Sequence, residues 1–180
     1  YMQEYFNKAQ IVDKEGQTRP LVAKEEKIVI TGKTPADFVS RGITPMQSAS
    51  LLLILVAGIS IYGIRRGKTL WGIDLILFLV AGMAGCILAF LALFSQHPAV
   101  SPNYILFVFH PFHLFCLPFM LSRVRKREIS RYMLVNFAVL TLFIGLWTII
   151  PQRIPPAVLP LALCLLIRSA SNLILTYKRK

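Results

Sequence analysis

Five long runs of apolar residues fill the chain from residue 46 onward. They cover residues 46–64, 70–94, 102–122, 132–150 and 156–177, so each run is 19 to 25 residues long. A helix needs about 20 residues to cross the hydrocarbon core of a bilayer. None of the runs shows a strong amphipathic period, as expected of helices that face both lipid and other helices. The pattern predicts an all-α integral membrane protein with a five-transmembrane-helix bundle.

The first 45 residues are polar and of mixed charge. They hold seven Lys and Arg against six Asp and Glu, with a turn expected at Asp13–Gly16 and a break at Thr44-Pro45. We expect residues 1–45 to be the end of an extracytoplasmic domain and residues 46–180 to be the transmembrane domain. Since the chain begins with Tyr1 and shows no signal peptide, we expect it to be the C-terminal part of a longer protein.

The formal net charge of +12 does not describe one basic surface, which argues against nucleic-acid binding. The segments 65–69, 123–131 and 178–180 hold eleven Lys and Arg, whereas the loops 95–101 and 151–155 hold only Arg153. Basic loops of membrane proteins stay in the cytoplasm. We therefore expect an extracytoplasmic N-terminus and a cytoplasmic C-terminus. The basic loop 123–131 could also bind anionic lipid, although setting the topology is its simpler role.

Asp74 and Arg168 are ionisable residues set within the apolar runs. A charge inside a membrane is costly and usually faces a partner or a cavity. By helix rise, both residues lie nearer the cytoplasmic ends of their helices. We expect a structural ion pair between them, and a proton or ion pathway is the alternative.

His110 and His113 lie three residues apart around Pro111, in the middle of the third run. Such a pair could bind a metal, but no carboxylate lies at matching spacing, so we expect no metal and favour a histidine packed at the proline kink. The chain has three cysteines, and all of them lie in apolar runs, where thiols are poor nucleophiles. We interpret them as core residues: Cys86, Cys116 and Cys164.

The loop between the second and third runs is uncharged but rich in polar groups. Ser95, His97 and Asn103 are bracketed by Pro98 and Pro102, which stiffen the backbone. A neutral histidine there could accept a proton or bind an ester or phosphate oxygen. Its alternative is a capped turn at the membrane interface. These three residues are the candidate catalytic residues, while the residues that carry catalysis remain unknown.

Several short motifs resemble the five-helix transmembrane domain at the C-terminus of the Lnb-type lipoprotein N-acyltransferases. The shared pattern is an Asp near the start of the second helix, a glycine-rich middle, a Ser-x-His-Pro loop, an Asn and a proline in the third helix. In this chain these are Asp74, Gly82, Gly85, Ser95-Gln96-His97-Pro98, Asn103 and Pro111. The family has Asn before that proline, where this chain has His110. The segments Tyr5–Ala9 and Gly16–Val22 also resemble the end of the family's periplasmic domain.

The resemblance implies a bacterial inner-membrane protein that takes part in lipoprotein biogenesis. It implies transfer of an acyl chain to the N-terminal Cys of a lipoprotein, with a phospholipid as possible acyl donor and no cofactor. Since most of the catalytic periplasmic domain would lie upstream, this chain alone would be inactive and would serve as a membrane anchor with a possible lipid-binding role. The alternatives are an anchor or scaffold without any lipid role, and a small transporter or channel subunit.

Overall fold

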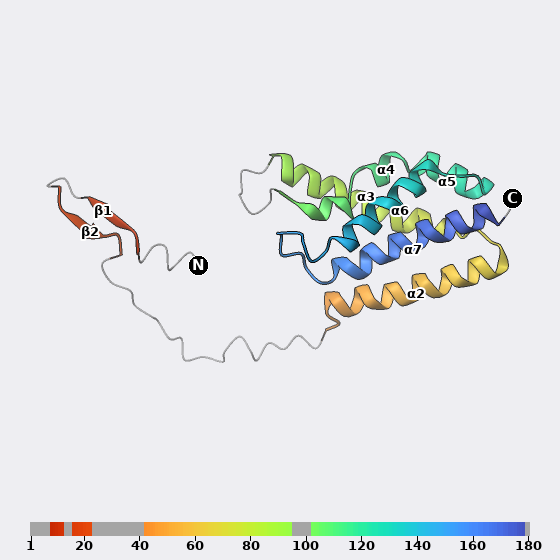
Figure 1. Cartoon of the computed structure of the whole chain (residues 1–180), viewed down its shortest axis with the longest axis horizontal. Helices are drawn as coiled ribbons and strands as arrows, with labels where there is room; N and C mark the ends of the chain where they lie inside the picture. Colours follow the sequence, from red (N-terminus) through yellow and green to blue (C-terminus); the bar gives the residue numbers. More distant parts are fainter. Residues whose placement is uncertain (1–7, 13–15, 23–41, 95–101, 179–180) are drawn as a thin grey trace. The chain divides into compact units, whose positions relative to one another are not determined.

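A computed structural model describes residues 8–12, 16–22, 42–94 and 102–178 of the chain (Figure 1). The chain divides into two units, Tyr1–Arg41 and Gly42–Lys180. The described part of the first unit contains a short hairpin of β1 (Gln10–Val12) and β2 (Thr18–Pro20), which pair antiparallel with Ile11 opposite Arg19. Gly16 lies between the strands with a φ of 80°, a conformation that glycine adopts without strain.

The second unit begins with two long helices, α2 (Pro45–Arg66) and α3 (Trp71–Phe94). A capping box starts α2, in which the Thr44 side chain accepts from the Gln47 backbone and the Gln47 side chain accepts from the Thr44 backbone. Gly67 ends the helix in the left-handed conformation, with a φ of 60°. The expected spans 46–64 and 70–94 correspond to these two helices.

The expected third span, residues 102–122, is not one helix. It consists of a 3-10 turn η2 (Tyr104–Phe107), a four-residue helix α4 (Phe112–Phe115) and helix α5 (Leu117–Lys126). The part before Cys116 is bent by 78° relative to α5. Pro111 and Pro118 lack the backbone N–H that a continuous helix needs, and in such a helix each ring would clash with the preceding turn. The sequence predicted one helix with a kink at Pro111, but residues 104–126 form separate helical pieces, which we call the broken segment.

The last two helices are α6 (Arg131–Gly145) and α7 (Val158–Tyr177). Both are shorter than the expected spans 132–150 and 156–177. Beyond Gly145 the chain continues in turns up to Pro151, where the missing N–H and the restricted preceding residue disfavour a helix. At the start of α7, turns from Pro155 and Pro156 precede the first helical residue.

Three helices in the described part are long and apolar enough to cross a membrane: α2, α3 and α7. The bent segment from Tyr104 to Lys126 would count as a fourth span, and α6 is apolar but has only 15 residues. The multi-helix transmembrane fold is thus confirmed. The five expected runs correspond to α2, α3, the broken segment, α6 and α7.

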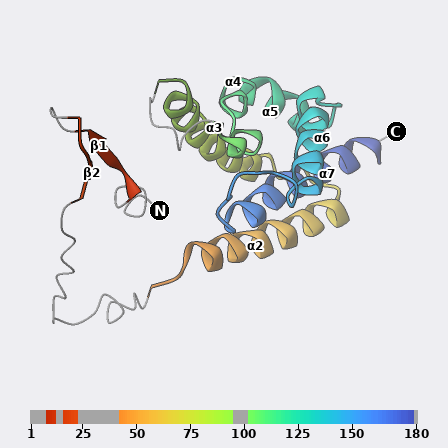
Figure 2. The ribbon, with the colours of Figure 1, turned by 60° about the vertical axis from the view of Figure 1, so that its left-hand side comes forward.

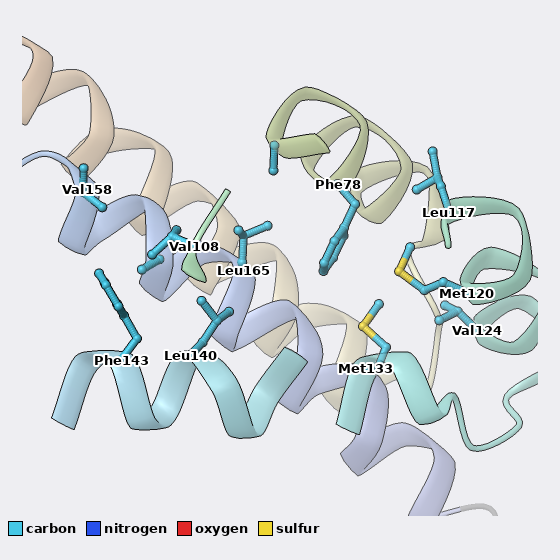
Figure 3. Close-up of a cluster of buried hydrophobic side chains, with 12 residues drawn as sticks. Phe78, Val108, Leu117, Met120, Val124, Met133, Leu140, Phe143, Val158 and Leu165 are labelled. Carbon is cyan, nitrogen blue, oxygen red and sulfur yellow. The ribbon is translucent and has the colours of Figure 1, made fainter. Parts of the chain in front are cut away.

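Helix α7 is central to this unit and packs along both α2 and α6 (Figure 2). More than half of the most apolar stretch of α7 is buried inside the protein, whereas only about a fifth of the corresponding stretch is buried in α2 and in α3. Helix α3 packs against α4 and α5. A cluster of buried side chains, including Phe78, Met120, Met133 and Leu165, fills the space between the helices (Figure 3).

Candidate functional site: two buried polar clusters and a lateral groove

The first polar cluster surrounds Asp74, which is fully buried in the first turn of α3. Arg168 of α7 donates from Nε to Asp74 Oδ1 at 2.6 Å and from Nη2 to Oδ2 at 3.0 Å. This is the bidentate geometry that makes arginine–carboxylate pairs strong. The structure thus contains the ion pair that the sequence predicts.

Two neutral side chains complete the hydrogen bonds of this ion pair. Ser60 of α2 accepts from Arg168 Nη1, and Asn172 of α7 donates to Asp74 Oδ2, each at 3.0 Å. All four residues are at most 5% exposed. A buried pair repays its desolvation only when its remaining hydrogen-bonding groups are also satisfied. The cluster therefore joins α2, α3 and α7 through charges that water does not reach.

The second polar cluster lies at the break in the third span. His113, which is fully buried, contacts the Val108 carbonyl oxygen through Nε2 at 2.9 Å and the Tyr132 hydroxyl through Nδ1 at 2.6 Å. A carbonyl oxygen only accepts, so Nε2 carries a proton and donates to Val108. Both ring nitrogens of His113 are therefore occupied, and the ring joins the broken segment to α6.

His110 stacks on His113, with ring centroids 3.9 Å apart and planes 18° from parallel. Its buried Nδ1 atom has no hydrogen-bond partner. Nearby on α6, Asn136 donates from Nδ2 to the Ser169 hydroxyl at 2.9 Å, and that hydroxyl donates to the Leu165 carbonyl. This chain of donors fixes the amide orientation and leaves Asn136 Oδ1 as a buried acceptor without a partner.

Two glycines of α3 allow the broken segment to approach closely. A methyl group added at Gly82 would lie 2.6 Å from the Leu114 backbone nitrogen, and one at Gly85 would lie 2.6 Å from the His110 carbonyl carbon. Both glycines therefore face the backbone of the segment η2–α4.

A groove of about 570 Å³ separates the broken segment from α6. Its walls include Leu106, Phe107, His110, Tyr132, Val135 and Asn136. Most of this lining is apolar, and the flanking residues Phe107 and Val135 are more than half exposed. The groove therefore opens sideways on the surface of the helical unit, and its accessible surface is almost entirely apolar.

The histidines do not converge on a common point. Stacked rings direct their nitrogens outward in their own planes, and both nitrogens of His113 are already bonded. Within the described residues, no three His, Cys, Asp or Glu side chains are grouped to hold a metal ion. The described cysteines are all unpaired, with Cys164 buried and Cys86 and Cys116 half-buried.

The outer-loop candidates Ser95 and His97 lie outside the described residues. Asn103, the third candidate, precedes η2, and its Oδ1 accepts from the Ile105 backbone at 3.2 Å. The next backbone nitrogen, that of Tyr104, donates to the Gln152 side chain at 2.7 Å. In the structure Asn103 therefore caps a turn, which is the structural alternative that the sequence left open.

Sequence reasoning did not single out Ser60, Tyr132, Asn136 or Asn172. A usable signal exists for Asn136 and Asn172, because an amide inside an apolar run must find hydrogen bonds there. Tyr132 and Ser60 give no such signal, since both residue types are common near helix ends and in helix contacts.

Comparison with known proteins identifies the helical unit. Residues 37–180 match the family model described as the Lnb transmembrane domain. Neither the curated proteins nor the solved structures give a significant match to the chain. The family match covers both polar clusters, the groove and all the helices described above. The chain therefore belongs to the Lnb transmembrane domain family.

Proposed function

We propose that this chain is the membrane part of a lipoprotein N-acyltransferase. The observation that carries the proposal is the family match over residues 37–180. In this role the helical unit anchors an upstream extracytoplasmic domain and holds it at the bilayer surface. The lipoprotein substrate binds through that upstream domain, and a membrane phospholipid supplies the acyl chain.

The proposal includes a bacterial inner-membrane location, with the N-terminal segment in the periplasm and the C-terminus in the cytoplasm. It rests on the eleven basic residues in 65–69, 123–131 and 178–180. The loop that contains Ser95, His97 and Asn103 then faces the compartment where lipoproteins are acylated. We propose that His97 assists the transfer by accepting a proton or by binding an oxygen of the donor.

A transporter or channel is less well supported by the charges. Transport paths through membranes usually carry ionisable groups that face a cavity. Here Asp74 and Arg168 neutralise each other, and both are at most 1% exposed. The charge pair supports a structural role, in agreement with an anchoring domain.

The test uses the protein as it occurs in cells, with lipoprotein N-termini read by mass spectrometry. Cells that lack the gene should produce lipoproteins without the N-linked acyl chain, and the unaltered gene should restore it. Unchanged lipoproteins in the deletion strain, with no other enzyme for this step, would contradict the proposed function.

The loop is tested by His97→Ala, with Gln96→Ala as the neighbouring control. If the ring moves a proton, His97→Ala should slow N-acylation by roughly a hundredfold at equal membrane abundance. The control should leave the rate near that of the unaltered protein. Equal rates for both variants would assign the loop a structural role and leave the domain as an anchor.

A further inference from the structure

The groove beside α6 continues into a polar hollow at the basic end of the helical unit. The hollow measures about 1200 Å³, and Arg123, Lys126, Glu128 and Arg131 contribute to its walls. The groove and the hollow share Cys116, Arg131 and Tyr132. The two adjoin and together form a depression with a charged part and a strongly apolar part, which is the polarity profile of a phospholipid.

Most arginines of the loop 123–131 already have partners in the structure. Arg123 pairs with Glu128 at 2.6 Å, Arg125 lies 4.7 Å from the centre of the Trp71 ring, and Arg127 donates to the Gly67 carbonyl. Arg131 differs, because no described carboxylate, ring or carbonyl is paired with it. Its exposed guanidinium lines both the groove and the hollow.

The position of Arg131 suits an anionic group. It is the first residue of α6, where the backbone N–H groups and the helix dipole also favour negative charge. A guanidinium binds two phosphate oxygens at once, in a bidentate geometry. A basic residue at a membrane surface adds roughly 1 kcal/mol of attraction for anionic lipid.

The apolar part of the groove suits an acyl chain. It runs along α6 from Tyr132 past Val135 and Val139, with Leu106 and Phe107 opposite. Its volume falls within the range of about 300–1,000 Å³ that small-molecule sites occupy. Because the groove opens on the lipid-facing surface, a chain can enter it sideways from the bilayer.

We infer that this depression binds one membrane phospholipid. Its phosphate contacts Arg131, and one acyl chain lies along α6. The site lies at the basic end of the unit, so under the proposed orientation it faces the cytoplasmic leaflet. It is therefore separate from the proposed acyl donor at the periplasmic side and does not depend on acyl transfer.

Photo-crosslinking of a labelled lipid tests this site. The full chain is placed in nanodiscs of phosphatidylglycerol and phosphatidylethanolamine that contain phosphatidylglycerol with a diazirine in one acyl chain. We expect crosslinks to concentrate on the groove residues of α6 and η2. Arg131→Gln should lower the yield at these residues about fivefold. Arg66→Gln, an exposed arginine at the same end of the unit, is the control and should leave the yield unchanged.

A second pair of variants tests the acyl-chain groove. Val135→Trp fills the groove and should abolish crosslinking there, whereas Leu134→Trp, its neighbour outside the groove, should not. Both positions are about half exposed or more, so both variants should fold. Equal yields for Arg131→Gln and Arg66→Gln, or for the two tryptophan variants, would show ordinary lipid contact and overturn the site. Because the readout involves no acyl transfer, failure of the proposed enzyme function is seen separately in the lipoprotein assay.

Discussion

Asp74 and Arg168 show how single side chains decide the stability of this domain. Asp74→Ala would leave a buried guanidinium without its counter-charge, and such a loss costs about 3–5 kcal/mol. We therefore expect a clearly lower melting temperature in detergent micelles. Asp74→Ala combined with Arg168→Leu should recover part of it, because both charges are then gone. Additive losses in this double-mutant cycle would contradict the coupling.

The exposed pair Arg123–Glu128 provides the control at the same scale. Its side chains are 61% and 43% exposed, so water screens the attraction. Glu128→Ala should change the stability by less than about 1 kcal/mol. If Glu128→Ala lowered the stability as much as Asp74→Ala does, the loss of stability would reflect the micelle conditions rather than the burial of the ion pair.

At the scale of elements, the close contact between α3 and the broken segment depends on Gly82 and Gly85, which have no side chain. An added methyl group at Gly85 would collide with backbone atoms of His110, which cannot rotate away. We expect Gly85→Ala to lower the unfolding free energy by about 1–3 kcal/mol, as other overpacked sites do. Gly58→Ala in α2 has open space around it and should be neutral or slightly stabilising. Thermal unfolding of the two variants side by side checks this, and equal behaviour would show that the broken segment can move away from α3.

At the scale of the whole molecule, the basic asymmetry predicts which loops face outward. A membrane-impermeant maleimide added to intact cells, in a background without the native cysteines, should label Ala99→Cys but not Ile129→Cys. Ile129 is preferred to its neighbour Ser130, which is 5% exposed and caps α6 through its hydroxyl. Permeabilised cells should label both positions. Labelling of Ile129→Cys alone in intact cells would reverse the topology and remove the basis for a periplasmic role of the outer loop.

The sequence by itself determined the properties that depend on short stretches of chain. The length of each apolar run predicts membrane helices, because crossing the hydrocarbon core depends on the residues of that run alone. The partnership of Asp74 and Arg168 was also predictable, since charges within spans must find each other. Pro111 marked the position of the break in the third span, but not its extent.

Only the tertiary structure decided the contacts that join residues from different helices. The Tyr132 hydroxyl bonds to Nδ1 of His113, and Ser169 fixes the orientation of Asn136, across separations of 19 and 33 residues in the chain. The 78° bend depends on the room that Gly82 and Gly85 leave for another backbone. The groove lies between that bent segment and α6, so it too depends on how distant parts of the chain pack. The hydrophobicity of a segment can be read from its own residues. Whether a buried polar atom has a hydrogen-bond partner depends on which residues of other helices pack next to it.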